Sequence, residues 1–144
     1  GEIAFQGKNP QGERWIIGID KPIDDPSGSV NDYELRIRLP QDAGGLATSG
    51  NYRNYKIIKG KKYAHTIDPK SGYPMQTDVL SATIIAPSCM LADGLATACM
   101  TRQASEVPKL IQHFPGVEYM LILGNPEGGY HTVMSPGFER LVIK

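Results

Sequence analysis

An excess of charge of either sign is missing from this chain of 144 residues, and so is any long apolar run. Fifteen basic residues balance fifteen acidic ones, which gives a formal net charge of zero. Nucleic-acid-binding domains carry basic patches that neutralise phosphates, so we expect no nucleic-acid partner. The sequence also has no span of ~20 apolar residues free of charge, which a membrane-crossing helix would require.

Cysteines are scarce, and the best-known catalytic signatures do not occur. Cys89 and Cys99 are the only two cysteines, and on one helix they would lie about 15 Å apart along its axis. A disulfide needs Cα atoms within about 7 Å, so we expect both thiols to be free. A Gly-rich dinucleotide fingerprint, a P-loop, a paired-cysteine zinc motif and a catalytic serine elbow are all absent.

The residues that are present are typical of a globular domain with many turns. Hydrophobic residues make up 40% of the chain, and sixteen glycines and eleven prolines indicate frequent turns and short strands. Ser88 can cap a helix that continues to about Arg102, and Ser105 can cap a second helix that ends near Phe114. Residues 44–50 are small, and we expect them to form a flexible connection. Strands are expected at residues 3–6, 15–19, 33–39, 55–58, 62–67, 80–86, 117–123, 130–134 and 141–143.

The order of these elements is strands, two helices and then strands. It predicts an α+β fold with a mainly antiparallel sheet. Without repeats or linkers, residues 1–144 are expected to form a single domain. Because Gly1 opens directly into strand-like sequence, we expect the chain to be part of a longer protein.

Asp93 is the first candidate for chemistry, because it is the only charged residue between Asp78 and Arg102. Its helix is apolar nearly all round, so we expect Asp93 to face inward, where a bare carboxylate would be costly. Thr97 lies one turn further on the same face. A carboxylate with a hydroxyl is the beginning of an oxygen site for Mg²⁺ or Ca²⁺. The alternative is a buried aspartate paired with backbone or an arginine, with Thr97 bonding back into its helix.

Two further segments are candidates, each with a structural alternative. His65 precedes a Gly/Pro-rich turn and could act as a general base near neutral pH, or it could be an ordinary strand histidine. Thr48, Ser49 and Gly50 offer hydroxyl and N–H groups to a phosphate or a flavin edge, but the same segment could be a simple turn or bulge. The other two histidines, His113 and His131, are interpreted as structural or surface residues.

Three ordered motifs together resemble the ApbE family, the FAD:protein FMN transferases. They are Ala47-Thr48-Ser49-Gly50-Asn51-Tyr52-Arg53, the segment from Lys62 to Pro74 with its His65-Thr66-Ile67-Asp68-Pro69 core, and Ala92-Asp93-Gly94-Leu95-Ala96-Thr97-Ala98. The resemblance covers essentially the whole chain and corresponds to the C-terminal half of such a protein. It implies the C-terminal portion of an ApbE-like fold.

The resemblance also implies roles for individual residues. Asp93 and Thr97 would bind the catalytic Mg²⁺, and His65 would be the base for an acceptor threonine. A further set would line the FAD site: Thr48, Ser49, Gly50, Tyr52 and Asp68. FAD would be the donor, and the products would be protein-linked FMN and AMP.

Partners and location are likewise implied only by the family. They are an acceptor flavoprotein, the N-terminal half or a second copy of the chain in a dimer, and a lipid anchor at the periplasmic face of the bacterial inner membrane. The motifs leave two alternatives open: an FAD-binding module without transfer activity, and a pyrophosphatase that cleaves FAD to FMN and AMP.

Overall fold

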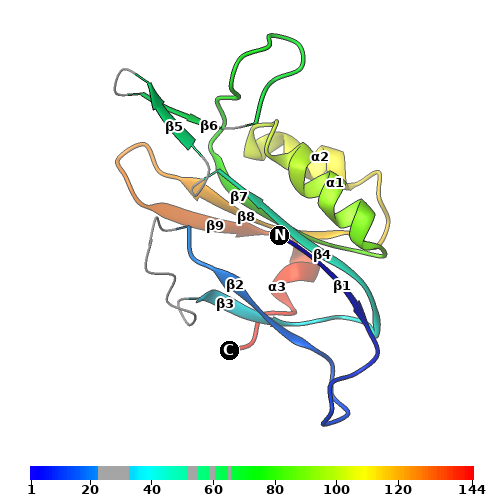
Figure 1. The fold of residues 1–144 in the computed structure, drawn as a ribbon. Coiled ribbons are helices and arrows are strands. Elements are labelled where there is room, and N and C mark those ends of the chain that lie inside the picture. Colours follow the sequence, from blue (N-terminus) through cyan, green and yellow to red (C-terminus); the bar gives the residue numbers. More distant parts are fainter. Residues whose placement is uncertain (23–32, 52–54, 59–60, 65) are drawn as a thin grey trace.

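The computed structural model describes residues 1–22, 33–51, 55–58, 61–64 and 66–144, and its centre is a five-stranded antiparallel sheet (Figure 1). The strand order is β1-β4-β7-β8-β9, and every neighbouring pair runs antiparallel. The five strands are β1 (Glu2–Gln6), β4 (Ala43–Gly50), β7 (Val79–Ala86), β8 (Glu118–Gly124) and β9 (Tyr130–Met134). The expected α+β class with an antiparallel sheet is confirmed.

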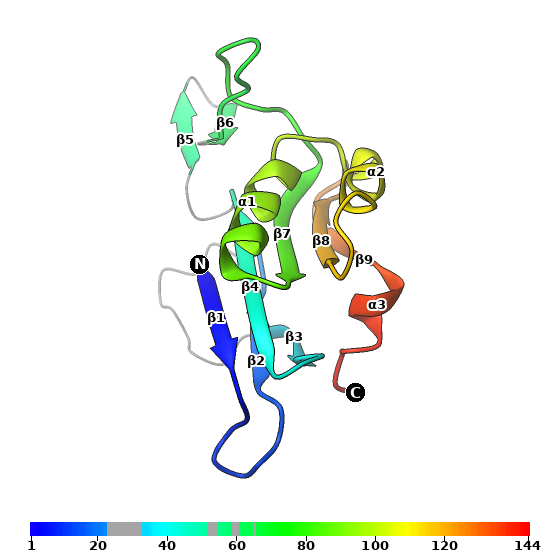
Figure 2. The ribbon, with the colours of Figure 1, turned by 90° about the vertical axis from the view of Figure 1, so that its right-hand side faces the viewer.

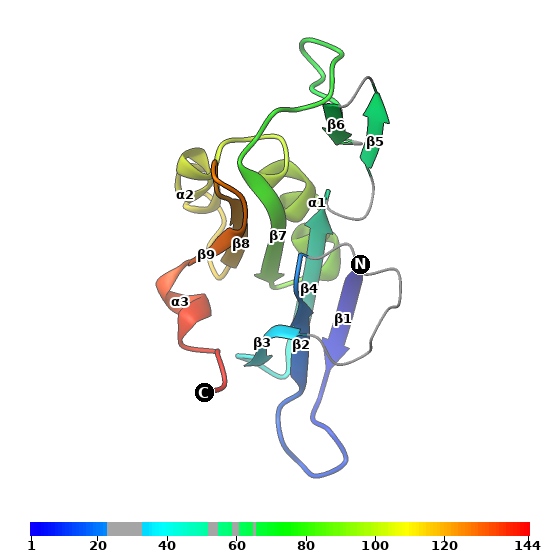
Figure 3. The same cartoon turned by 90° about the vertical axis from the view of Figure 1, so that its left-hand side faces the viewer.

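The sheet has a core on each face, because residues along a strand alternate between the two sides. On one face, Ala47 and Ile84 pack with the helices α1 (Cys89–Cys99) and α2 (Val107–Ile111). On the other face, Leu46 and Ile85 belong to a second core. That core is shared with the hairpin of β2 (Ile16–Asp20) and β3 (Tyr33–Arg38) and with α3 (Pro136–Glu139). Figures 2 and 3 show the helical layer and the hairpin layer on opposite sides of the sheet.

The expectation that residues 44–50 form a flexible connection is wrong. They are most of β4, which lies between β1 and β7. The small residues reflect close packing rather than mobility: a Cβ on Gly45 would lie 2.2 Å from the Cα of Cys89 and 2.3 Å from its backbone nitrogen. A strand without side chains at this point lets the first turn of α1 approach the sheet backbone.

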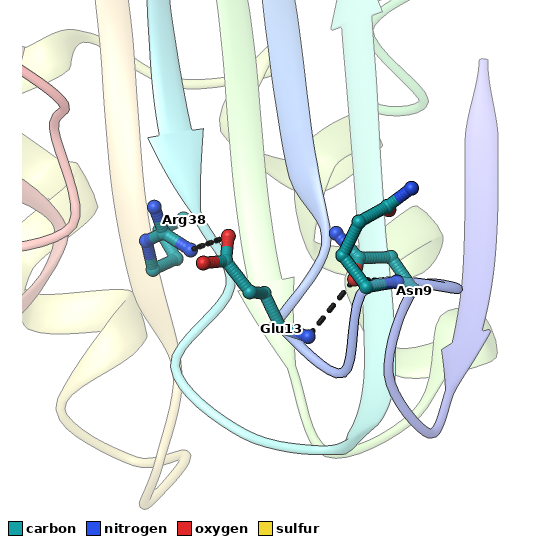
Figure 4. A network of polar contacts seen from close by, with 4 residues as sticks. Asn9, Glu13 and Arg38 are labelled. Carbon is teal, nitrogen blue, oxygen red and sulfur yellow. Dashed lines mark hydrogen bonds and ion pairs between the residues drawn. The ribbon is translucent and has the colours of Figure 1, made fainter.

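The connection between β1 and β2 is held by a local polar network (Figure 4). The side-chain oxygen Asn9 Oδ1 accepts hydrogen bonds from the backbone N–H groups of Gln11 and Glu13, at 3.0 and 2.9 Å. The carboxylate of Glu13 then pairs with Arg38 Nη1 on β3 at 3.3 Å. The ion pair ties this connection to the hairpin layer.

The helices agree with the sequence in part. Ser88 caps α1 as expected, with its hydroxyl accepting from the Leu91 N–H. The second helix is a 3₁₀ turn (Ala104–Glu106) followed by α2. The expected last strand at residues 141–143 is wrong, since Val142 forms only an isolated bridge to Ile37 and the short helix α3 precedes it, capped by Ser135.

The cysteines and the helix lengths also agree with the sequence. Both Cys89 and Cys99 are free, as expected. In the described ranges, the helices are all too short or too polar to traverse a lipid bilayer.

Between β4 and β7 the chain makes an excursion that carries the hairpin of β5 (Tyr55–Ile58) and β6 (Lys61–Ala64). The two ends of this excursion lie side by side at the end of β4 and the start of β7, where the Asn51 N–H donates a hydrogen bond to Leu80 O at 3.0 Å. We call its described residues, 55–58, 61–64 and 66–78, the arm. In Figures 1 and 3 the arm projects from the end of the sheet at which β4 finishes and β7 starts.

Candidate functional site

Ser49 and Thr97 are brought together although they are 48 residues apart in sequence. Ser49 lies near the end of β4, and its hydroxyl oxygen is 3.4 Å from Thr97 Oγ1 on α1. The contact follows from strand alternation, because Ser49 shares the α1 side of the sheet with Ala47. Two of the three sequence motifs therefore converge at one place.

Thr48 faces the other way. Its hydroxyl lies 2.8 Å from that of Thr83, its cross-strand partner on β7, and Thr83 is buried. Thr48 is thus on the face opposite to α1, whereas Ser49 is on the α1 face. Gly50 pairs with Ser81 at the end of the β4–β7 ladder, and Tyr52 lies outside the described residues. Their proposed contacts with a flavin nucleotide stay predictions.

Asp93 does not face inward, contrary to the expectation from its apolar helix. The residues of α1 that are buried are Ala92, Leu95, Ala96 and Cys99. Asp93 and Thr97 lie on the opposite, exposed stripe together with Gly94 and Met90, and Met90 is 84% exposed. The apolar composition of the helix is misleading, because Met90 and Gly94 are apolar or small and yet exposed, and the helix buries only one face.

This stripe has the donor chemistry of a divalent-cation site. A carboxylate and a hydroxyl are hard oxygen ligands, and Mg²⁺ is often held by one or two carboxylates with waters and substrate phosphates completing its shell. Asp93 and Thr97 are four residues apart, so they are neighbours on the helix surface. Among the residues that the structure describes, no three His, Cys, Asp or Glu side chains gather into a metal cluster. The protein residues present fit a shared site, completed by substrate oxygens, better than a closed all-protein cage.

Asp68 is used within its own turn. Its carboxylate oxygen Oδ1 accepts the Lys70 N–H at 3.0 Å. This hydrogen bond has the largest effect in lowering the pKa of Asp68 below its ordinary value, and a hydrogen bond from the Ser71 hydroxyl has the next largest. The carboxylate shapes the turn, and its contact with a cofactor stays a prediction. His65 lies outside the described residues, so its role as a base stays a prediction.

A group of anchoring residues escaped the sequence analysis. The Thr77 hydroxyl donates to the backbone carbonyl of Arg102, just after α1, and Asp78 Oδ1 accepts the Ala104 N–H at 2.9 Å. One residue earlier, Gln76 O accepts from Gln103 Nε2 at 3.0 Å. These bonds fix the base of the arm beside the end of α1. A polar Thr-Asp pair directly before a buried strand was the available signal.

Comparison with known proteins identifies the family to which this fold and these motifs belong. Residues 1–121 match the ApbE family. The FAD:protein FMN transferase of Haemophilus influenzae is 37% identical over 141 residues, which is 98% of this chain and 39% of that protein. The corresponding protein of Salmonella typhimurium is 32% identical, covering 99% of this chain and 39% of its own length. This chain belongs to the ApbE family.

Solved structures show the same fold. The ApbE protein of Thermotoga maritima superposes with a TM-score of 0.77 at 30% identity, covering all of this chain and 43% of its own. The flavin transferase ApbE of Vibrio cholerae has a TM-score of 0.73 at 31% identity, covering 98% of this chain and 42% of its own. The chain therefore spans about 40% of the length of the relatives it matches.

Proposed function

We propose that this chain is part of a flavin transferase that moves FMN from FAD to a threonine of an acceptor protein with the help of Mg²⁺. The observation that carries the proposal is the meeting of Ser49 and Thr97 at 3.4 Å, one helical turn from the exposed carboxylate of Asp93. Membership of the ApbE family and the name of its relatives, FAD:protein FMN transferase, supply the reaction.

The reaction is a phosphoryl transfer whose atoms balance without an oxidant or reductant. The threonine oxygen forms a bond to the FMN-side phosphorus of FAD, and the bond from that phosphorus to the oxygen of AMP breaks. The hydroxyl proton passes to a base, for which the sequence offers His65, and AMP leaves. Catalysis of this kind rests on positioning and on neutralising charge around the phosphates.

Asp93, Thr97 and Ser49 would together position the nucleotide. The side-chain oxygens of Asp93 and Thr97 lie at a fixed spacing on one helix, and the Ser49 hydroxyl lies beside that of Thr97 from the sheet. The buried face of α1, packed on β4 and β7, keeps this spacing rigid. A Mg²⁺ bound there would supply positive charge to the pyrophosphate oxygens.

The test is made on the natural protein that contains this sequence, with FAD, Mg²⁺ and an acceptor fragment that carries the target threonine. We expect the acceptor to gain the mass of FMN, one AMP to be released for each FMN transferred, and an acceptor with valine in place of threonine to stay unmodified. Free FMN and AMP with an unmodified acceptor would identify a pyrophosphatase instead. FAD binding without any product would identify a binding module.

A further inference from the structure

The arm contains a turn at residues 66–75 that is held by hydrogen bonds of its own backbone. The Asp68 N–H donates to Tyr73 O at 2.9 Å, and the Met75 N–H donates to Thr66 O at 2.9 Å. Ile67 and Pro74 form a bridge between these two bonds. We call this segment the Tyr73 turn. Its conformation is set before any partner arrives, so binding to it would cost little ordering entropy.

The Tyr73 turn exposes large apolar side chains. Tyr73 is 74% exposed and Ile67 is 49% exposed, and Lys70 beside them is also exposed. Tyrosine is one of the residues most often found at binding hot spots, because it offers a large, stiff contact area at low entropic cost. By contrast, Tyr130 directs its hydroxyl to Glu34 at 2.8 Å and is half-buried. The Tyr73 side chain is thus left largely uncovered by the residues that the structure describes.

The position of the turn relates it to the candidate site. The base of the arm is fixed to the residues after α1 by the bond from Thr77 to Arg102 O, and Thr97 lies in the last turn of α1. Ser49 lies at the end of β4 from which the arm departs. Figure 1 shows the turn as the green loop that rises beyond this end of the sheet, past α1. A polypeptide lying along the arm would reach the exposed stripe of α1.

From this placement we infer that the Tyr73 turn is a docking element for the acceptor polypeptide, with the Tyr73 ring and Ile67 contacting residues that flank the acceptor threonine. The inference rests on the proposed function, because only a protein-modifying enzyme needs to hold a polypeptide beside its nucleotide site. Tyr73 is a binding residue in this account and takes no part in the phosphoryl transfer.

The experiment separates acceptor binding from donor binding in the natural protein. Tyr73→Ala is compared with Tyr73→Phe, which keeps the ring, and with Val133→Ala, a similarly exposed apolar residue on β9. Transfer rates are measured against acceptor concentration at saturating FAD, and FAD affinity is measured separately by calorimetry. We expect Tyr73→Ala to raise the acceptor KM about tenfold, the effect of losing one hot-spot side chain. FAD affinity and the melting temperature should stay at the wild-type level, and the two control variants should behave like wild type.

Each other result has a definite meaning. An unchanged acceptor KM in an active enzyme would overturn the docking inference and leave the proposed function intact. Weaker FAD binding by Tyr73→Ala would place the ring on the flavin, and a lowered melting temperature would show that it packs against other parts of the protein; either would overturn the inference. A wild-type protein that transfers no FMN would overturn both proposals.

Discussion

The hydroxyl oxygen of Ser49 lies 3.4 Å from the hydroxyl oxygen of Thr97, so the end of β4 touches the exposed face of α1. Neither residue is fully buried. The contact thus sits at the surface, where a nucleotide could reach it, and Asp93 lies one helical turn away. Close approach of α1 to β4 is what makes the contact possible, and that approach depends on Gly45.

The first prediction concerns this approach. Gly45→Ala would place a Cβ 2.2 Å from the Cα of Cys89, and because the obstacle is backbone, the whole first turn of α1 must move. We expect a loss of about 3 kcal/mol in the free energy of unfolding, the upper end of the cost of overpacking. Denaturation in urea would measure it.

Gly94→Ala is the matched control on the same pair of elements. A Cβ on Gly94 meets nothing within 4 Å, and alanine favours a helix over glycine by up to about 1 kcal/mol. This variant should be more stable than wild type. Equal stability changes in the two variants would contradict the role of Gly45 in helix packing.

The helix and strand positions show how far the sequence could predict the fold. The strand β7 and the cap at Ser88 were predictable, because a segment rich in β-branched residues and a capping serine are local signals. By contrast, β4 was not expected to be a strand, because its glycines are typical of a loop. Gly45 has to be glycine because the backbone of Cys89 packs against it. Cys89 is 44 residues away in the sequence, so no local pattern could show this contact.

The candidate site was predictable in composition but not in orientation. Spacing alone placed Asp93 and Thr97 on one face, and the structure confirms that they share it. Which face of the helix would be buried depended on where the sheet lay. Likewise, the opposite directions of the Thr48 and Ser49 side chains could be predicted only if both residues were known to belong to a strand.

A second prediction concerns the pH response of the turn at Asp68. Its pKa lies below the ordinary value because the Lys70 N–H and the Ser71 hydroxyl bond to the carboxylate. Such a group stabilises the turn at pH values above the unfolded-state pKa, and that contribution is lost as the pH falls through the lower, folded-state pKa. NMR titration of the Asp68 carboxyl in the wild type and in Ser71→Ala should show a higher pKa in the variant. No change would show that Ser71 does not contribute.

A third prediction separates the two cysteines. Burial raises the pKa of the Cys99 thiol from 9.0 to about 11, an effect that the charge of Arg102 partly offsets, whereas Cys89 is half-buried. An alkylating reagent at pH 8 should therefore label Cys89 well before Cys99 in the folded protein, because the thiolate is the reactive species. Mass spectrometry of the labelled peptides measures the order. Faster labelling of Cys99 would contradict its placement in the core.

The same pKa shift contributes to the pH dependence of stability above pH 9. Because the pKa of Cys99 is higher in the folded state, ionisation favours the unfolded chain. The contribution of Cys99 to stability is complete below pH 9 and should be lost as the pH rises toward 11. Cys99→Ala should weaken this pH dependence.

In the proposed reaction, Asp93 provides the carboxylate of a Mg²⁺ site used in FMN transfer. The most direct test of this role is the rate of transfer as a function of Mg²⁺ concentration in the natural protein carrying Asp93→Asn, with Asp42→Asn as the control. Asp42 is an exposed carboxylate whose ion pair with Arg14 is long, at 3.7 Å.

We expect Asp93→Asn to fold normally, because the residue is exposed. It should need far more Mg²⁺ and transfer FMN about 100-fold more slowly or worse, as when one preorganised electrostatic group is removed from an active site. Asp42→Asn should behave like wild type. A wild-type rate and Mg²⁺ dependence for Asp93→Asn would contradict the assignment of the metal site.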